Sequence, residues 1–300
     1  MNHRVMAIFV LCALAGPTVS GQTAGLRSPA GAGSAQASLA VGPDGRVYLS
    51  WIEPAGEQRH ALKFSVLGDS SWSAPHTIAE GSNWFVNWAD FPALTILPGG
   101  SMAAHWLERS GPDTYAYDVR IVRSSDAGAT WSAPVTPHRD STQTEHGFVS
   151  MFPAPDGSLG AVWLDGREMT GGEEGHGHGN MTLRYATIGG TGGASGEVIL
   201  DNMVCECCQT SAAITARGPV VVYRDRLEGE IRDISVVRLV DGAWTTPQSL
   251  ARDGWKIDGC PVNGPAIAAM DRAVAVAWFT ALADTIQPDE THHHALGRGL

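Results

Sequence analysis

A short pattern recurs five times along this chain and constrains the fold more than any other feature. Each copy has a stretch of small residues, a turn, an apolar run and then an aromatic residue. By subtraction the aromatic residues lie 55, 57, 60 and 55 positions apart, and they are Trp51, Trp106, Trp163, Tyr223 and Trp278. Around each of them we predict two short antiparallel strands joined by a tight turn containing Gly, Pro, Asp or Asn. A repeat of this length with about four strands per unit is typical of a β-propeller blade. The predicted fold class is therefore all-β, a propeller of four-stranded blades.

The start of the chain departs from the repeat. An apolar run over residues 5–15 follows a basic start and is too short to span a membrane. We therefore predict a cleaved signal peptide over residues 1–21, and a secreted or periplasmic protein without membrane insertion. Residues 22–36 are rich in Gly, Ala and Ser and predict a flexible lead-in. The propeller is then expected over residues 37–300.

The fifth copy of the pattern is shorter than the others. After Trp278 the sequence lacks the alternation expected for two outer strands. We therefore expect four blades plus a partial fifth, from a propeller that has six blades in full-length form and is incomplete at its C-terminus. Three consecutive histidines, His292, His293 and His294, lie in this last stretch. We interpret them as part of a solvated tail, with metal binding as the alternative.

The charge of the chain limits the classes of partner that it can bind. The formal net charge of -11 excludes nucleic acid, because binding its phosphates requires clustered basic residues. The expected partner is a glycan or glycoconjugate, or a protein surface. The protein is expected to be a monomer.

One segment, "SSDAGATW", has the spacing of an Asp-box, and its defining residues are Ser124, Asp126, Gly128, Thr130 and Trp131. Asp126 can accept hydrogen bonds from its own turn, Gly128 permits a left-handed backbone, and Trp131 can pack on a neighbouring strand. On this motif and the blade repeat, the chain resembles the sialidase-like (BNR/Asp-box) β-propeller family. The resemblance implies that the motif lies on the turn between the third and fourth strands of a blade, away from the ligand face. We therefore interpret Asp126 as structural.

The resemblance also implies how a substrate would be held. Sialidases bind the carboxylate of sialic acid through three arginines, the first of them in an Arg-Ile-Pro motif. Here Asp90, in "DFPALTILPGG", occupies the place of that arginine, and a carboxylate repels another carboxylate. No Tyr–Glu nucleophile pair is assigned. Within the family the chain is similar to exported bacterial members with the segments "CECCQT" and "GCPVNGP". The implied activity is that of an exo-sialidase-like glycoside hydrolase, and the missing arginine argues against sialic acid as the substrate.

The repeat also predicts which residues share a face. The inner strand of each blade starts at the rim where the second strand ends, so the loops at both points converge. The candidate catalytic carboxylates in these loops are Asp90, Glu108, Asp165, Glu168 and Asp225. Two carboxylates at a suitable separation would support glycoside hydrolysis. Trp84, Trp88 and Trp255 can stack on sugar rings or pack between blades.

Arginines occur at nearly the same offset from the aromatic residue in successive repeats, and they are Arg109, Arg167, Arg224 and Arg226. They can form a ligand-binding cradle for an anion such as an acidic sugar. Alternatively each pairs with a neighbouring carboxylate, and the acidic neighbours favour these ion pairs.

Four cysteines follow the leader: Cys205, Cys207, Cys208 and Cys260. An even number in an oxidising compartment favours two disulfides, with three possible connectivities. Cys205 and Cys260 each lie 18 residues before their aromatic anchor, so a bridge between adjacent blades is one of the options. The alternative is a copper or zinc site in which the thiolates combine with histidines of the same face, His146, His176 or His178.

Three classes of function follow from these patterns. We favour a propeller that binds or hydrolyses glycans at the face where the loops converge. The alternatives are a non-catalytic binding propeller and a metalloprotein with a Cys/His site.

Overall fold

The structure is a computed structural model that describes residues 25–169, 179–190, 193–270 and 273–281. The predicted signal peptide and the histidines His176, His178, His292, His293 and His294 lie outside these residues. Apart from a 3-10 turn at Pro98–Gly100, the elements of the described chain are β-strands. No helix among them is long and apolar enough to cross a membrane.

The strands form five antiparallel sheets that follow one another along the chain. The first sheet contains β1 (Ala35–Val41), β2 (Val47–Pro54), β3 (His60–Val66) and β4 (His76–Gly81). The second contains β5 (Ala93–Ile96), β6 (Met102–Arg109) and β7 (Tyr117–Ser124). The third contains β8 (His146–Pro153), β9 (Leu159–Asp165), β10 (Met181–Ile188) and β11 (Ala194–Val204). The fourth contains β12 (Ser211–Thr215), β13 (Gly218–Arg224), β14 (Ile234–Val240), β15 (Ala243–Trp244) and β16 (Gln248–Ser249), and the fifth pairs β17 (Ala266–Met270) with β18 (Ala273–Ala277).

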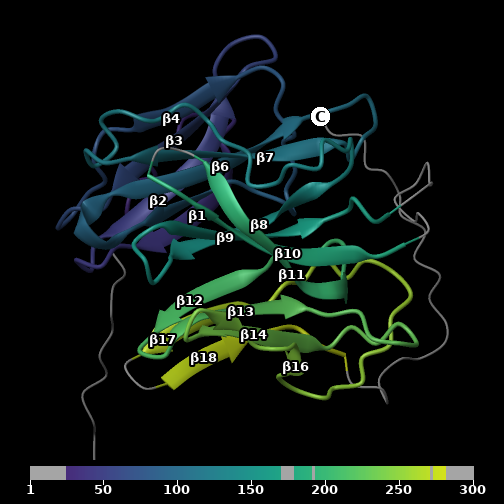
Figure 1. Ribbon diagram of the computed structural model, residues 1–300. Helices are drawn as coiled ribbons and strands as arrows, with labels where there is room; N and C mark the ends of the chain where they lie inside the picture. Colours follow the sequence, from purple (N-terminus) through teal and green to yellow (C-terminus); the bar gives the residue numbers. More distant parts are fainter. Residues whose placement is uncertain (1–24, 170–178, 191–192, 271–272, 282–300) are drawn as a thin grey trace, which may run out of the picture.

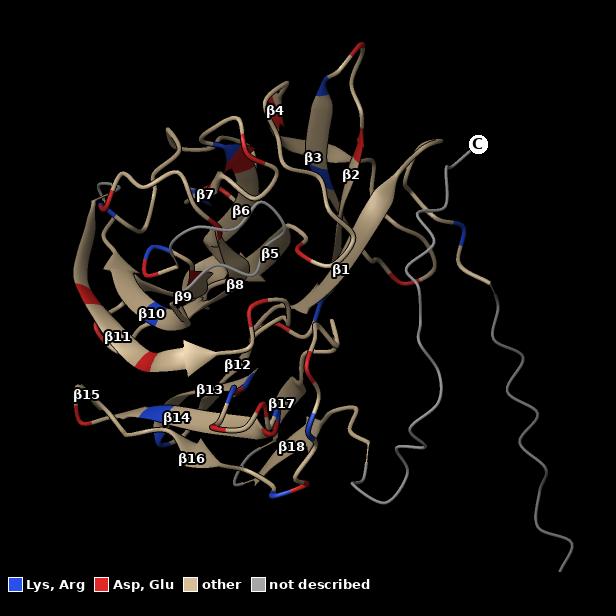
Figure 2. Ribbon diagram, turned by 90° about the vertical axis from the view of Figure 1, so that its right-hand side faces the viewer, with Lys and Arg blue, Asp and Glu red and all other residues tan. Residues whose placement is uncertain are grey.

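The five sheets surround a common axis. The first strand of each sheet contributes to one cavity of about 470 Å³, and residues from these strands include Leu39, Thr95, Ser150, Ser211 and Ala266. In Figure 2 the inner strands β1, β5, β8, β12 and β17 lie toward the centre and the remaining strands lie outside them. Figure 1 shows the same sheets from the side, from purple β1 to yellow β18. The predicted all-β propeller is confirmed.

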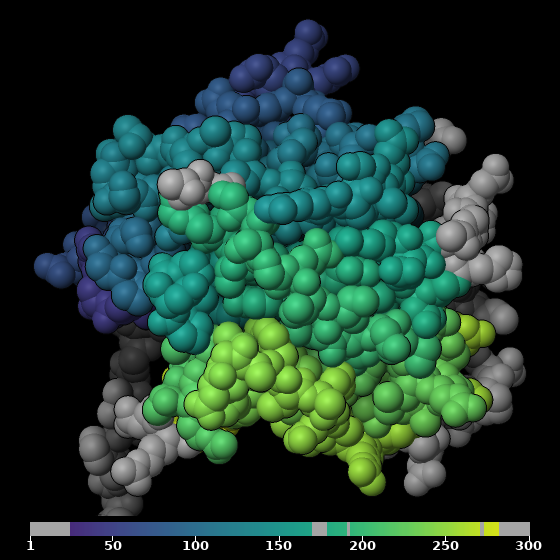
Figure 3. All heavy atoms as spheres, viewed as in Figure 1, coloured from purple at the N-terminus to yellow at the C-terminus, as the bar shows by residue number. Residues whose placement is uncertain are grey.

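The hydrophobic core lies between neighbouring sheets. The repeated aromatic residue is on the second strand of the first four sheets, and Trp51, Trp106, Trp163 and Tyr223 are all at most 5 % exposed. One apolar cluster joins the first and second sheets, another joins the second and third, and another joins the third and fourth. In Figure 3 the colours on the visible surface follow the sequence from purple at the top through teal and green to yellow-green at the bottom. Because the first four sheets bury apolar residues against their neighbours, the repeat supplies the core.

The Asp-box forms the turn after β7. Asp126 Oδ1 accepts a hydrogen bond from the Thr130 amide at 2.9 Å, and its Oδ2 accepts one from the Thr130 hydroxyl at 2.6 Å. The Thr130 hydroxyl is the main reason why the pKa of Asp126 is lowered to about 2. Gly128 has φ +86°, and Trp131 packs edge-on against Phe64 with ring centroids 6.4 Å apart. This turn follows Ser124, at the opposite end of β7 from Tyr117, and is a structural element.

Candidate functional site

The loops that precede four of the inner strands line one pocket. This pocket has a volume of about 510 Å³ and lies before β5, β8, β12 and β17. Each of the four loops brings one carboxyl group, and these are Asp90, Glu145, Glu206 and Asp258. Loops from separate repeats therefore meet at one rim, which is the convergence that the repeat predicts.

Aromatic side chains form the rest of the wall. Phe85, Tyr117 and Phe148 are buried against the sheets, while Trp88 is 74 % exposed and Tyr115 is 47 % exposed. Two exposed aromatic rings beside clustered carboxyls are suited to stacking on a sugar ring.

The other two tryptophans that could stack on sugar rings pack against aromatic residues of the protein. Trp84 stacks on Trp106 with ring centroids 5.5 Å apart. Trp255 is 5 % exposed and meets the edge of Phe279. Of the three candidates, Trp88 is the one that the structure places at the pocket.

A hydrogen-bonded chain of Asp90, Tyr117 and Glu145 crosses the pocket. The Tyr117 oxygen lies 2.9 Å from Asp90 Oδ2 and 2.7 Å from Glu145 Oε1. A phenol has one proton to donate, so one of the two carboxyls must itself be protonated to complete both bonds. Burial raises the pKa of Glu145 to about 8 and that of Asp90 to about 7. The arrangement therefore holds a proton on Glu145, which donates to the Tyr117 oxygen, while Tyr117 donates to Asp90.

The backbone around Asp90 is shaped to hold this carboxyl. The Phe148 amide donates to Asp90 Oδ1 at 2.8 Å, and Phe148 has φ +53°, a conformation that non-glycine residues rarely adopt. A Cβ atom at Gly147 would collide with Asp90 Oδ2. Strained backbone of this kind is concentrated at functional sites.

Glu206 differs from the other carboxyls because it is ion-paired. Its Oε2 lies 2.6 Å from Arg232 and its Oε1 lies 3.5 Å from Arg226. Both arginines also pair with Glu230, at 2.7 and 2.8 Å. The pocket therefore contains a charged carboxylate beside two carboxyls that share a proton.

The four arginines considered as a cradle are not gathered at this pocket. Arg167 pairs with Asp165 at 2.6 Å, and Arg226 pairs with Glu230 and Glu206 as described. Arg224 is 1 % exposed and donates to backbone carbonyl oxygens, and Arg109 lies over the Phe85 ring at 5.4 Å. Among the described residues that line the pocket, none is Arg or Lys.

Most of the predicted catalytic carboxylates also lie elsewhere. Glu108 is 3.4 Å from Arg120, and Glu168 is 3.1 Å from Arg184. Asp225 accepts a hydrogen bond from the Ser235 hydroxyl at 2.6 Å, and burial raises its pKa to about 6. Asp165 is completely buried and accepts from Trp163 Nε1 at 2.7 Å. Asp90 is the one of the five candidates that the structure places in the pocket.

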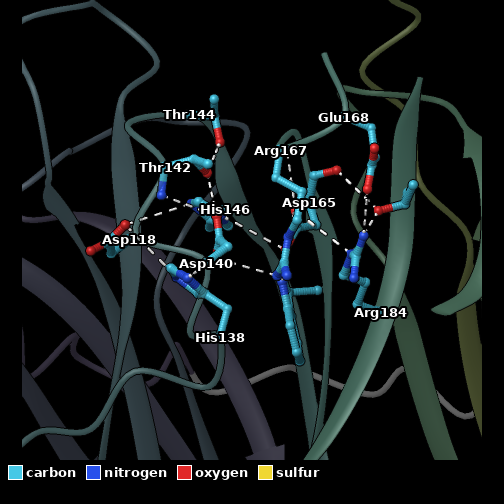
Figure 4. A network of polar contacts seen from close by, with 12 residues as sticks. Asp118, His138, Asp140, Thr142, Thr144, His146, Asp165, Arg167, Glu168 and Arg184 are labelled. Carbon is cyan, nitrogen blue, oxygen red and sulfur yellow. Dashed lines mark hydrogen bonds and ion pairs between the residues drawn. The ribbon is translucent and has the colours of Figure 1, made fainter. Parts of the chain in front are cut away.

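His146 belongs to a separate buried network, shown in Figure 4. Its ring stacks on His138 with centroids 3.7 Å apart, and Asp140 accepts from both rings at 3.2 and 2.8 Å. Burial lowers the pKa of His138 to about 4, with the charge of His146 adding to this. For His146 burial also opposes the charge, but Asp140, Asp165 and Asp118 outweigh it and raise the pKa. The two shifts have opposite directions, so a positive charge on this pair is more favourable on His146 than on His138.

This network could also offer ligands to a metal. The ligand atoms of Asp118, His138 and His146 lie within 4.8 Å of one another, and so do those of Asp140, His146 and Asp165. Arg167 and Arg184 lie against the second group, at 2.6 and 3.7 Å from Asp165. Positive charges so close to Asp165 oppose a cation, so the histidine–carboxylate network is better described as an ion-pair network.

Cysteines form another cluster beside the pocket. Cys205 Sγ lies 3.5 Å from Cys208 Sγ and 3.8 Å from Cys207 Sγ, and all four described cysteines are free thiols. Cys207 and Cys260 line the pocket. Hydrogen bonds from Cys207 and Cys208 lower the pKa of Cys205 to about 3, and the bond to Cys205 raises that of Cys208 to about 12. His146 is grouped with carboxylates and not with these sulfurs.

Sequence reasoning missed Glu145, Glu206 and Tyr117. A signal for the two glutamates was present, because Asp90, Glu145 and Glu206 precede their aromatic anchors by 16, 18 and 17 residues. Tyr117 had no such signal. It opens the third strand of its blade, and its contact with both carboxyls depends on how two sheets meet.

Comparison with known proteins supports the fold. No protein-family model matches the sequence, and no curated protein matches it either. A crystal structure of a protein of unknown function from Dyadobacter fermentans matches with a TM-score of 0.51 and 14 % identity, over 83 % of this chain and 79 % of that chain. An α-L-arabinofuranosidase from Fusarium graminearum, in complex with an iminosugar inhibitor, matches with a TM-score of 0.50 and 14 % identity, over 84 % and 76 %. A thermostable family-43 glycoside hydrolase gives a TM-score of 0.49 at 10 % identity, over 85 % and 87 %. The chain thus has a distant structural similarity to β-propeller glycoside hydrolases, and the likeness concerns the fold.

Proposed function

We propose that this protein binds a glycan in the pocket formed by the loops before its inner strands and hydrolyses a glycosidic bond there. The observation that carries the proposal is the combination of exposed aromatic rings with three carboxyls, two joined through the Tyr117 hydroxyl and one ion-paired with arginines. Trp88 and Tyr115 offer flat faces for a sugar ring, and Asp90, Glu145 and Glu206 offer acid and base groups. The glycosidase fold of the neighbours supports the same class of ligand.

The charge of the pocket favours a neutral glycan. Its described lining contains four acidic side chains and no basic one. An anionic sugar would find no Lys or Arg in this described lining to pair with its charge. Tyr117 and Glu145 form a Tyr–Glu pair of the kind that the sialidase resemblance implies. Because the described lining has no Lys or Arg, we expect the sugar beside Tyr117 and Glu145 to lack a carboxylate.

The protonation states suggest a division of roles. Glu145 keeps its proton at neutral pH because it is buried, so it is suited to protonate the departing glycosidic oxygen. Glu206 is ion-paired and so is suited to activate water or to stabilise positive charge on the sugar. Asp90 and Tyr117 keep Glu145 in place and supply a route for returning its proton.

The leader remains part of the proposal. We infer export from the basic start and short apolar run of residues 1–21. Sequencing the amino terminus of protein recovered from a bacterial periplasm tests it, and an intact leader would argue against it.

Two substitutions test the function. In a screen of neutral and acidic oligosaccharides, we expect Trp88→Ala to weaken binding at least about tenfold, or 1.4 kcal/mol, because the stacking face is lost. We expect Glu145→Gln to reduce hydrolysis by about 10² to 10⁴-fold with binding retained, because the acid proton is lost. Glu80→Gln, at an exposed carboxylate on β4, is the matched control and should change neither quantity.

The outcomes separate the alternatives. Binding without hydrolysis by the unmodified protein would identify a binding propeller. Binding that is unaffected by Trp88→Ala, or a preference for acidic over neutral sugars, would contradict the pocket assignment.

A further inference from the structure

The four cysteines converge from two loops that are far apart in the sequence. Cys205, Cys207 and Cys208 lie between β11 and β12, and Cys260 lies before β17. The three sulfurs of the first loop are all within 4.8 Å of one another. Cys260 lies on the same side of the molecule, because it lines the same pocket as Cys207. The cluster therefore links the fourth sheet to the fifth.

The spacing of the sulfurs is that of a shared metal ion. Tetrahedral coordination with metal–sulfur bonds of about 2.3 Å places neighbouring sulfurs about 3.8 Å apart. The distances observed from Cys205 are 3.5 and 3.8 Å. A disulfide would require one pair at about 2.05 Å, and neither distance from Cys205 is that short. Cys205 has two sulfur neighbours at similar distances, as expected when the sulfurs bind the same metal ion.

The surroundings are suited to concentrated negative charge. Cys205 and Cys208 are 0 % and 2 % exposed, so thiolates there would be costly without compensation. A positive charge is present beside the same loop, because the Arg232 guanidinium lies 2.6 Å from Glu206, the residue that follows Cys205. The Arg232 side chain is 3 % exposed, and its Nε is buried without a hydrogen-bond partner among the described residues.

We propose that Cys205, Cys207, Cys208 and Cys260 together bind one thiophilic metal ion, Zn²⁺ or Cu⁺. Four sulfur donors select these ions over Mg²⁺, Ca²⁺ or Mn²⁺, which prefer oxygen. His146 is not a ligand, because it lies in the separate network with Asp140 and Asp165. The site is a structural clasp, because it ties the loop before β12 to the loop before β17 at the wall of the pocket. This proposal stands apart from the proposed hydrolysis, which uses other residues.

The experiment measures metal binding by the full-length protein, reduced and kept anaerobic. Zn²⁺ and Cu⁺ are titrated separately against competing chelators, with Co²⁺ as a spectroscopic probe of thiolate ligation. We expect one equivalent bound, thiolate-to-Co²⁺ charge-transfer bands, and loss of reactivity of the four thiols that a chelator reverses.

Variants connect the binding to the residues. Cys260→Ser changes an exposed position and should fold, and we expect it to weaken binding by more than about 100-fold, since even losing an outer-shell partner costs about 10 to 100-fold. Cys207→Ser should act similarly. Asn202→Ser, at an exposed position near the cluster, should leave the affinity unchanged.

Two results would overturn the proposal. The first is reduced protein that binds neither ion more tightly than micromolar. The second is binding that survives both Cys207→Ser and Cys260→Ser. Recovery of two disulfides together with the first result would assign the cluster to covalent bridges.

Discussion

At the scale of residues, the pocket is organised by one shared proton. Asp90 and Glu145 both approach the Tyr117 hydroxyl, and both hydrogen bonds can form only if one carboxyl is neutral. Burial decides in favour of the neutral form, because it disfavours the charge on both groups. The pocket therefore carries less negative charge than its composition suggests.

The shared proton predicts a pH dependence of stability. Folded Glu145 has a pKa of about 8, against an ordinary value of 4.5. A raised pKa stabilises the fold fully below the ordinary value, and this contribution is lost as pH rises through that window to about 8. We expect Glu145→Gln to remove a slope of about 1.4 kcal/mol per pH unit from the free energy of unfolding between pH 5.5 and 7.5.

Urea unfolding at several pH values measures this slope. Glu80→Gln should keep the slope of the unmodified protein, because its carboxylate is exposed. An equal slope for Glu145→Gln and the unmodified protein would show that Glu145 is ionised in the folded state.

At the scale of elements, the pocket and the Asp-box turn lie at opposite ends of the blades. The starts of inner strands carry the pocket carboxyls, whereas the turn after β7 carries the Asp-box. The turn needs a left-handed residue at Gly128, where an added Cβ would lie 2.5 Å from Phe64. That contact makes the turn part of the packing between the first and second sheets.

This close approach predicts a difference between two glycines. Gly45 also has positive φ, at +78°, but an added Cβ there meets nothing within 4 Å. We expect Gly45→Ala to cost about 1 kcal/mol of unfolding free energy from backbone strain alone. Gly128→Ala should cost about 1 to 3 kcal/mol more, because Phe64 must also move.

Chemical denaturation of both variants measures the two costs. Equal destabilisation would mean that the turn is not packed on Phe64 as described.

At the scale of the whole molecule, stability is distributed among contacts between sheets. Trp106 lies in the cluster that joins the first and second sheets and is 5 % exposed. The inner strands contribute less at the two ends of the series, where Leu39 and Met270 are 67 % and 62 % exposed. The sixth blade expected for the full-length form stays a prediction.

The packing predicts very different effects for two tryptophans. Trp106→Ala should cost about 3 to 5 kcal/mol of unfolding free energy, because it leaves a cavity between sheets. Trp88→Ala removes the same side chain from an exposed position, so its effect should stay within about 0.5 kcal/mol. Urea midpoints compare the two, and similar losses would place Trp88 in the core.

How much the sequence could predict depends on the range of the interaction. The spacing of Trp51, Trp106 and Trp163 predicted the blades, because strands and hairpins form between neighbours in the chain. The same spacing predicted that the loop of Asp90 would meet the loop of the cysteines. It did not predict the partners of Arg226 or the place of Tyr117, because these depend on side-chain packing between sheets.

The sequence by itself determined the all-β fold, the order of the sheets and the rim at which the loops meet, because a repeat with local turns specifies them. Only the tertiary structure decided which of the gathered residues act together. It turned the arginines toward carboxylates and backbone, joined Asp90 to Glu145 through Tyr117, and separated His146 from the cysteines. The physical reason is that burial and hydrogen-bond geometry are properties of the packed sheets, and they set the charges on which chemistry depends.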